Sequence, residues 1–315
     1  MGTDNSGVER ATAEADVRER ILREFHENGR ASYAAVAQRL GVPRTAVVQT
    51  VQGAIARGEL RLAVSVSPDL LGLHRFAYVQ IGLDSAAGPA RQALVGMPET
   101  TFVADIAGPF PLEAELRVGS DQHLRDALER ITLMPGVRDV RTHIYEHIDV
   151  NQYSPLRTGR STLSIDDVDR RLIRSLQENC RASFRELGDA AELSASGARL
   201  RYERLIAHRA VKVVGIPVRG DRSETPSLGV GIRTRGRVAE LLPRFRALEP
   251  EFLAVCVGGY DFIATLSGGS AAQLLDVTDR LRDLEAVSAV DVWANLRVVK
   301  EQYGDGDRIP VPTAG

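Results

Sequence analysis

The sequence repeats at a spacing of 151 residues, and this repeat constrains the possible fold more than any other feature. When the chain is shifted by 151 positions, Asp16–Ser32 falls on Asp167–Ser183, and nine of the seventeen positions are identical. Apolar positions still agree beyond this window, as in the pair Leu60 and Val211. A unit of about 150 residues is too long for one turn of a solenoid, whose repeats run to about 50 residues. The repeat therefore indicates a duplicated pair of domains.

Composition excludes several classes of protein. The 315 residues are 43% hydrophobic and 26% charged with a net charge of −2, which is typical of a globular chain and not of a disordered, collagen-like or disulfide-stapled one. No apolar run approaches the ~18 residues of a membrane span, and the polar N-terminus lacks the apolar core of a secretory signal. The two cysteines, Cys180 and Cys256, form no C-x-x-C pair, which argues against a thiolate zinc site. We expect a cytoplasmic protein with no membrane partner.

Composition also indicates the boundaries of the domains. Residues 151–162 are polar, contain proline and glycine and show no periodicity, so we interpret them as a linker between the two copies. Residues 1–11 and 304–315 resemble loose tails. The expected domains are a helical head at 12–66, a mixed domain at 72–150, a second head at 163–218 and a second mixed domain at 225–303.

The start of each copy has helical periodicity. In the second copy, serines that favour the N-cap position precede three apolar-periodic segments, at Ser164, Ser183 and Ser194. The matching helices of the first copy are expected to begin near Asp16, Ser32 and Pro43. Three short helices with a tight second connection are typical of a helix-turn-helix domain.

The later part of each copy changes to short alternating or apolar segments. In the first copy we expect strands near 76–83, 101–107, 112–118 and 137–148, with helices at 89–95 and 121–130. In the second copy we expect strands at 228–232, 252–257, 262–266 and 289–299, with helices at 238–248 and 271–282. The order β-α-β-β-α-β is the ferredoxin-like arrangement. The predicted fold class is therefore α+β, with helix-turn-helix, winged-helix-like domains alternating with ferredoxin-like domains and the whole unit duplicated.

The third helix of each head is the candidate DNA-reading element, because in this motif it enters the major groove. Arginine can read guanine or pair with phosphate, and the free N–H groups at a capped helix start can bind a phosphate. Local charge agrees, since residues 181–219 hold eight basic and four acidic residues. The alternative is that these arginines only solvate an exposed helix face. The candidate DNA contacts are Ser194, Ser196, Arg199, Arg201 and Arg204 in the second head and Arg44, Thr45 and Gln49 in the first.

Residues 165–214 resemble the DNA-binding head of the Lrp/AsnC (feast/famine) regulators. The segment reads IDDVDRRLIRSLQENCRASFRELGDAAELSASGARLRYERLIAHRAVKVV. It shows an acidic pair before the first helix, an R-x-S opening of the second and an L-S start of the third. The mixed domain that follows resembles the ligand-sensing, dimerising domain of that family. The resemblance covers nearly the whole chain twice and implies double-stranded DNA as a partner, control by a small molecule that is often an amino acid, and association into a homo-oligomer.

A G-x-Y-D-like turn at Gly258, Gly259, Tyr260 and Asp261 is the candidate effector site that the resemblance implies. The Asp261 carboxylate would bind an ammonium group and the glycine backbone a carboxylate group. The alternative is an ordinary β-turn that glycine permits and aspartate closes. In the first copy Gly108–Pro111 replaces this turn, and proline stands where the acid is expected. We therefore expect effector binding to be confined to the second half or much stronger there.

Other chemistry finds little support in the sequence. His143 and His147 share a face but lack a third ligand, so we predict no metal site, and no triad of catalytic residues can be assembled, so we predict no enzyme and no cofactor. One alternative is a tetrapyrrole enzyme, since siroheme decarboxylases share this duplicated architecture. Such enzymes typically carry a histidine-bearing segment where this chain has 101–116 and 252–266, which contain no histidine. Another alternative is a ligand-binding module with vestigial heads.

Overall fold

The computed structural model describes residues 5–155, 163–218, 226–268 and 270–303. The chain forms two compact units. The first, which we call the head unit, holds residues 1–66 and 159–218, and the second, the sensor unit, holds 67–158 and 219–304. Both helical heads thus belong to one unit and both mixed domains to the other. Within the described residues, a search for helices with the length and apolar character of a membrane span finds none.

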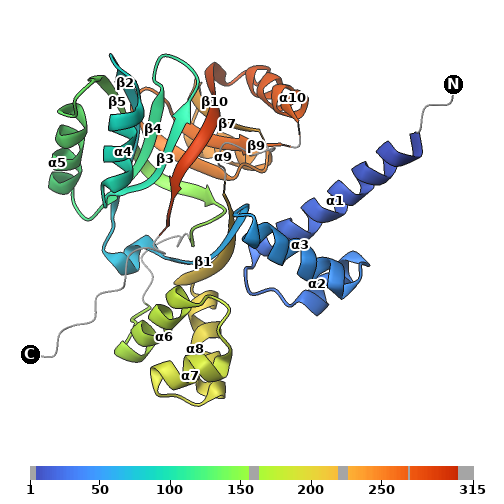
Figure 1. Cartoon of the computed structure of the whole chain (residues 1–315). Coiled ribbons are helices and arrows are strands. Elements are labelled where there is room, and N and C mark those ends of the chain that lie inside the picture. Colours follow the sequence, from blue (N-terminus) through green and yellow to red (C-terminus); the bar gives the residue numbers. More distant parts are fainter. Residues whose placement is uncertain (1–4, 156–162, 219–225, 269, 304–315) are drawn as a thin grey trace, which may run out of the picture. The chain divides into compact units, whose positions relative to one another are not determined.

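Each head contains three helices followed by one strand (Figure 1). The first comprises α1 (Asn5–Glu27), α2 (Tyr33–Leu40), α3 (Arg44–Ala56) and β1 (Leu60–Val66), and the second comprises α6 (Asp167–Glu178), α7 (Phe184–Ala191), α8 (Ala195–Ala207) and β6 (Val211–Pro217). Buried apolar side chains from α1, α2 and α3 form the core of the first head. The predicted helix-turn-helix domains are therefore confirmed.

Helix caps are better formed in the second head than in the first. The Ser183 side chain and Glu186 make a reciprocal capping box on α7, and the Ser194 side chain accepts a hydrogen bond from Gly197 N on α8. The cap of α6 is Asp166 and not the predicted Ser164, because Asp166 and Asp169 cap each other's backbone. In the first head, Ser32 makes no side-chain cap bond.

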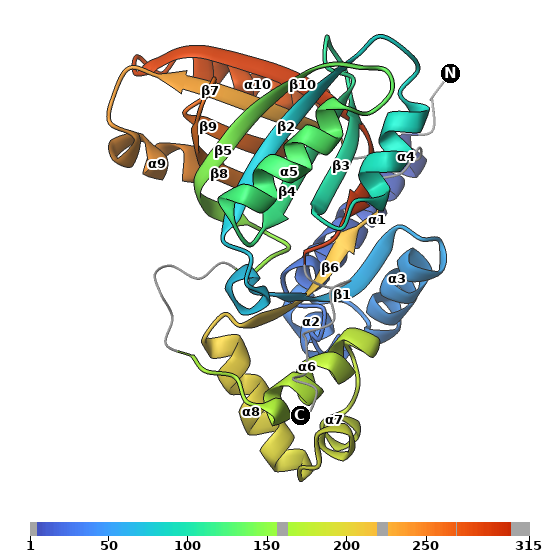
Figure 2. The same cartoon turned by 90° about the vertical axis from the view of Figure 1, so that its left-hand side faces the viewer.

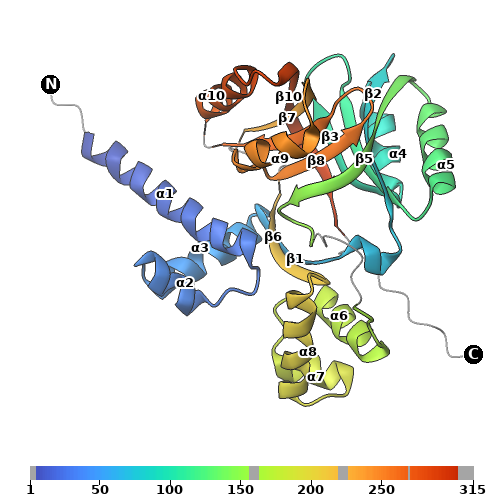
Figure 3. The same ribbon diagram turned by 180° about the vertical axis from the view of Figure 1, so that it is seen from behind.

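A two-stranded antiparallel sheet joins the two heads (Figure 3). Strands β1 and β6 pair over seven residues in continuous register, from Leu60 opposite Pro217 to Val66 opposite Val211. A further backbone bond runs from Gly29 N to Val213 O at 2.8 Å. The sequence prediction missed both strands. They fix the two heads to each other within the head unit.

The sensor unit is a closed barrel of eight strands, built from two ferredoxin-like domains (Figure 2). The first domain contains β2 (Arg75–Leu83), α4 (Gly88–Gly96), β3 (Thr100–Ile106), β4 (Leu112–Val118), α5 (Asp121–Thr132) and β5 (Val137–Asn151), after a short 3-10 helix η1 (Pro68–Leu71). The second contains β7 (Ser227–Thr234), α9 (Val238–Arg246), β8 (Phe252–Val257), β9 (Phe262–Ser267), α10 (Ala271–Arg282) and β10 (Val287–Glu301). Both follow the predicted β-α-β-β-α-β order, so the ferredoxin-like prediction is confirmed.

The two sensor domains join edge to edge. The barrel order is β10-β3-β4-β2-β5-β8-β9-β7, so the last strand of each domain pairs with the second strand of the other. Helices α4 and α5 cover the outer face of one sheet and α9 and α10 the other, each through its own apolar core. A third core, in which half of the buried side chains are aromatic, lies between the sheets. The inner faces of both sheets are therefore buried in the barrel.

Two expected boundaries differ from the structure. Helix α1 begins at Asn5, so part of the supposed tail 1–11 is helical and the head extends beyond 12–66. Strand β5 runs to Asn151, and the next residues still pack on the barrel, since Tyr153 is buried and Gln152 N donates to Glu251 O at 2.9 Å. The predicted linker 151–162 thus begins within the sensor unit. Residues 156–162 and 304–315 lie outside the described residues.

Candidate DNA-binding surface and effector pocket

Helix α8 presents three of its predicted DNA contacts to solvent. Ser194, Ser196 and Arg199 are all exposed near its N-terminus. The Arg199 Nε atom donates to Glu203 Oε1 at 2.8 Å, one turn later on the same helix. An exposed pair of this kind contributes little stability, because water screens it. Arg199 can therefore exchange this partner for a base or a phosphate at small cost.

The other two predicted arginines of α8 make contacts within the head. Arg201 donates to Asp166 at 2.7 Å and to Asp169 at 3.0 Å, and Arg204 also pairs with Asp169. The Asp169 side chain is fully buried, and removing one partner of a buried ion pair is strongly destabilising. These contacts tie α8 to α6 and give both arginines a structural role, which the sequence reasoning did not foresee. DNA contact by Arg201 and Arg204 stays a prediction.

Helix α3 of the first head presents a different set of residues. Arg44, Thr45 and Gln49 are all exposed on its first two turns. Thr45 and Gln49 have hydrogen-bonding groups of the kind that contact base edges, but they bring no charge. The two heads therefore offer unlike surfaces to DNA.

Two arginines bind the heads together in a reciprocal way. We call this pair, Arg30 and Arg181, the arginine clasp. Arg30 donates to the backbone carbonyls of Cys180 and Ala182, at 2.7 Å each, while Arg181 donates to those of Gly29 at 2.5 Å and Ala31 at 3.3 Å. Each guanidinium also lies over two aromatic rings of the opposite head. The repeat contains the signal, since both positions are identical, but single-sequence reasoning did not connect them.

The predicted effector turn makes its contacts with the neighbouring strands β5 and β7. Gly258 has a φ of +142°, a backbone conformation that residues with a side chain rarely adopt. A Cβ atom on Gly259 would lie 3.0 Å from His143 Cε1. The Asp261 carboxylate accepts hydrogen bonds from the backbone N and the side-chain hydroxyl of Thr234, at 2.6 and 3.0 Å. These contacts are those of the β-turn alternative. Effector binding at Gly258, Gly259, Tyr260 and Asp261 stays a prediction.

Tyr260, from the same turn, belongs to an aromatic cluster inside the barrel. Its ring is buried and stacks on His143 with 4.7 Å between centroids, and its hydroxyl donates to Asp291 at 2.8 Å. Tyr78 and Trp293 complete the cluster, with 5.9 Å between their centroids. Burial lowers the pKa of His143 to about 4, with help from the charges of Arg141 and Arg233. His143 is therefore neutral near pH 7.

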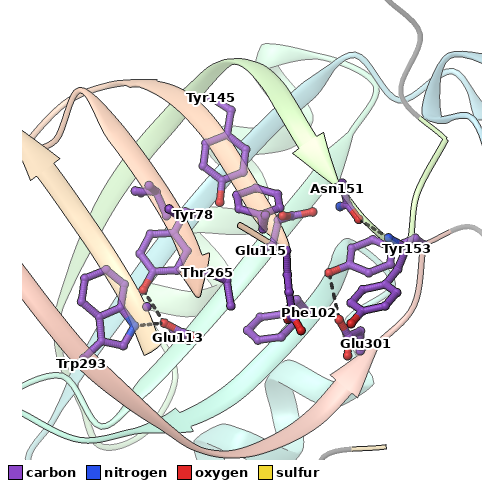
Figure 4. A pocket seen from close by; sticks show the side chains of 16 residues that line it. Tyr78, Phe102, Glu113, Glu115, Tyr145, Asn151, Tyr153, Thr265, Trp293 and Glu301 are labelled. Carbon is purple, nitrogen blue, oxygen red and sulfur yellow. Dashed lines mark hydrogen bonds between the residues drawn. The ribbon is translucent and has the colours of Figure 1, made fainter. Parts of the chain in front are cut away.

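A pocket lies inside the barrel, and its lining comes from both sensor domains (Figure 4). Its empty space is about 520 Å³, including the solvent at its mouth. None of the residues predicted from the sequence to bind an effector is among those that line it. The lining residues are Tyr78, Phe102, Glu113, Glu115, Tyr145, Asn151, Tyr153, Gly229, Glu251, Phe252, Ile263, Ala264, Thr265, Trp293, Glu301 and Tyr303.

The buried acid Glu113 in this pocket has a strongly raised pKa. Its Oε2 atom accepts hydrogen bonds from the Tyr78 hydroxyl at 2.5 Å and from Trp293 Nε1 at 2.6 Å. Burial raises its pKa to about 7, although both hydrogen bonds act in the opposite direction. The carboxyl group is therefore half ionised near neutral pH, and its charge depends on what lies beside it.

The second buried acid, Glu115, is already paired with a cation. Its Oε1 atom accepts from Arg117 Nε at 2.6 Å and from Thr101 Oγ1 at 2.9 Å. Both glutamates come from β4, whose alternate residues face the barrel interior while the intervening ones face the helices. The sequence reasoning missed them because polar residues alternating with apolar ones in a strand normally indicate a face in water.

The first comparison with known proteins concerns sequence families. The AsnC-type helix-turn-helix domain matches residues 19–53 and 165–206, and the Lrp/AsnC ligand binding domain matches 77–147. An uncharacterized HTH-type transcriptional regulator from Pyrococcus abyssi is 30% identical over 129 residues, covering 39% of this chain and 80% of that protein. This chain belongs to the Lrp/AsnC family. An HTH-type transcriptional regulator from Mycobacterium tuberculosis is 31% identical over 119 residues, covering 37% of this chain and 80% of its own.

The matches also support the duplicated form of this Lrp/AsnC protein. The head model matches twice, and each of these relatives aligns with about two fifths of the chain. The ligand-binding match falls on the first sensor domain, so the departure at Gly108–Pro111 does not take that domain out of the family.

A solved structure shares the duplicated fold. The crystal structure of the siroheme decarboxylase NirDL has a TM-score of 0.58 and 13% identity, and covers 91% of this chain and 93% of its own. The same protein in complex with an iron-uroporphyrin III analogue gives a TM-score of 0.57. At this identity the likeness concerns the fold alone.

Proposed function

We propose that this protein is a sequence-specific, DNA-binding transcriptional regulator whose activity is controlled by a small-molecule effector, such as an amino acid or a related metabolite. The observation that carries the proposal is the head unit, in which two helix-turn-helix domains of one chain are joined by β1, β6 and the arginine clasp. A regulator of this kind acts in the cytoplasm, where its DNA lies. Association of chains into a homo-oligomer is part of the proposal because the family resemblance implies it.

The unlike heads predict an unlike pair of half-sites. The second head offers Ser194, Ser196 and Arg199, whereas the first offers Arg44, Thr45 and Gln49. Identical heads on a two-fold axis require palindromes, but one chain of this protein does not present identical heads. One chain therefore prefers an asymmetric operator, and a palindrome is bound only when two chains associate. A footprint of a single chain on a perfect palindrome would contradict this.

The Arg199→Ala variant tests the groove assignment. It should lose roughly 1–3 kcal/mol of DNA-binding free energy and relax specificity at one base position. The matched control is Arg282→Ala, which removes another exposed arginine with a local acidic partner, but from the sensor unit. Gel retardation and binding isotherms over a salt series measure both, and affinity should fall steeply with salt. Equal affinity of Arg199→Ala and wild type at low salt would show that α8 does not read DNA.

A tetrapyrrole enzyme is the second candidate, and the likeness to the siroheme decarboxylase fold is the observation that favours it. The pocket lining argues against such a ligand in the barrel, because Glu113, Glu251 and Glu301, which unlike Glu115 do not pair with Arg117, would repel the many carboxylates of a uroporphyrin-type compound. Absorption spectroscopy tests this candidate directly. A stoichiometric, coloured complex with iron-uroporphyrin III would support the enzyme, and retardation of promoter DNA without such a complex would support the regulator.

A further inference from the structure

We propose that the barrel pocket binds an organic cation, a primary amine or a quaternary ammonium compound that also carries an oxygen acceptor. The inference rests on the proposed function, because it assigns the chemical class and the place of the effector of that regulator. It moves the site from the Gly258–Asp261 turn to the barrel interior. It also changes the ligand from a zwitterion to a cation.

The charge of the lining is the first argument. The sixteen lining residues include four glutamates and no lysine, arginine or histidine. The nearby Arg117 is not among the lining residues; its Nε and Nη1 atoms donate to Glu115 and, at 3.2 Å, to the Ser154 hydroxyl, and its Nη2 atom finds no acceptor among the described residues. A carboxylate ligand would bring a further negative charge into this buried space, whereas a cation would compensate one that is present.

The aromatic side chains are the second argument. Tyr78, Tyr145, Phe102, Phe252 and Trp293 all line the same space, and Figure 4 shows rings on several sides of it. The faces of such rings attract cations, and cages of aromatic residues recognise ammonium groups in many proteins. Aromatic rings together with buried carboxylates select for positive charge on a hydrocarbon body. They do not favour a small inorganic ion, for which the described residues offer no cluster of three or more candidate ligands.

An unsatisfied amide is the third and independent argument. Asn151 is 93% buried in the pocket wall, and its Oδ1 atom accepts from Tyr153 N at 3.0 Å. Its Nδ2 group finds no acceptor among the described residues. A buried donor without a partner is unfavourable, so the site gains when a ligand supplies an oxygen acceptor. In Figure 4, Asn151 and Glu113 lie at opposite ends of the pocket, which fits a cation at one end and an acceptor at the other.

The two sensor domains differ in the residues that line the pocket, and this difference limits the number of cation-binding sites. Within β4 the pocket is lined by Glu113 and Glu115, whereas in β9 of the second copy the pocket-lining residues are Ile263, Ala264 and Thr265, none of which is acidic. The two sensor domains together form one cavity with one set of these acids. We therefore expect one cation per chain.

Trp293 provides the assay, because it is the only tryptophan of the chain and hydrogen bonds to Glu113 in the pocket. The probes are choline and tyramine, with tyrosine and 4-hydroxyphenylacetate as matched controls that keep the ring of tyramine and change its charge. Either cation should change the tryptophan emission saturably with a stoichiometry near one. The zwitterion and the anion should bind at least ten-fold more weakly.

The Glu113→Gln variant should weaken binding of the cation at least ten-fold at pH 8, where the wild-type carboxyl is ionised. Glu129→Gln removes an exposed charge from α5 and should bind like the wild type. If Glu113→Gln does not fold, the charge series on the wild-type protein still decides. The proposal is overturned if neither cation changes the emission, or if 4-hydroxyphenylacetate binds as tightly as tyramine.

DNA retardation by the ligand-free protein, measured on the same samples, separates the two proposals. Retained DNA binding without any cation binding would overturn the pocket assignment alone. Cation binding by a protein that retards no promoter DNA would support the pocket and contradict the regulator.

Discussion

Replacing Glu113 by glutamine should change how the stability of the sensor unit depends on pH. The carboxyl has an ordinary pKa of 4.5 when unfolded and about 7 when buried in the barrel. Between these values the folded protein keeps a proton that the unfolded chain has released, so stability falls as the pH rises. Each unit of difference between the two pKa values corresponds to about 1.4 kcal/mol, so the unfolding free energy that is lost between pH 4.5 and pH 7 amounts in total to about 3 kcal/mol. Glutamine has no proton to lose and should abolish this fall.

Protonation of His143 makes the stability of the same barrel depend on pH in the opposite direction. Its pKa is lowered from 6.5 to about 4 because the ring is buried, so the unfolded chain takes up a proton first as the pH falls. This group therefore destabilises the barrel progressively from pH 6.5 down to 4, also by about 3 kcal/mol. In the wild type the two trends cancel between about pH 4.5 and 6.5. In Glu113→Gln only the histidine trend is left.

Urea unfolding followed by Trp293 emission between pH 4 and 8 measures this effect, because the single tryptophan reports on the sensor unit. Relative to the wild type, Glu113→Gln should gain about 3 kcal/mol of unfolding free energy from pH 4.5 to 8. The control His143→Phe keeps an aromatic ring beside Tyr260 and should become less stable from pH 4.5 to 7. A constant difference between Glu113→Gln and wild type across this range would refute the reasoning.

Four further substitutions test other parts of the structure. Gly229→Ala places a Cβ 2.0 Å from Trp293 Nε1, so it should lower the thermal midpoint and shift the tryptophan emission, and an unchanged midpoint would contradict the packing. Removing either half of the arginine clasp, Arg30→Ala or Arg181→Ala, should cost the head unit about 2 kcal/mol or more and weaken DNA binding, as chemical unfolding and retardation assays would show. Asp261→Ala should leave effector-free DNA binding nearly intact. Calorimetry of this variant with amino acids then tests whether the turn binds the effector. Undiminished amino-acid binding by the variant would show that Asp261 is not part of the effector site.

The sequence allowed the fold to be predicted closely where periodicity and caps are strong. Strands 112–118 and 252–257 and helix 271–282 have the predicted bounds, because each has a clear pattern and a clear stop. Strands β1 and β6 were missed because each is stabilised by the other, 151 residues away, and not by its own pattern. A single sequence does not contain that pairing.

The candidate site was harder to predict, since it depends on which face of a strand meets another sheet. Glu113 and Glu115 alternate with apolar residues as they would in a strand with one face in water. Only closure of the barrel by β3–β10 and β5–β8 pairing buries them. Arg201 and Arg204 in the second head were also misjudged because their partners lie on another element. Carboxylates at the start of α6 pair with these two arginines, which the sequence of α8 alone would leave free to contact DNA.

The arginine clasp and the β1–β6 sheet join two heads that belong to a single polypeptide. Regulators that pair their heads by dimerisation lose the pair on dilution, because the equilibrium depends on the amount of protein. Here the second head is tethered to the first at a high effective concentration that does not change with expression level. A few copies in a cell would carry the same paired heads as many copies, and occupancy of an asymmetric operator by single chains would rise in simple proportion to the number of chains at low abundance.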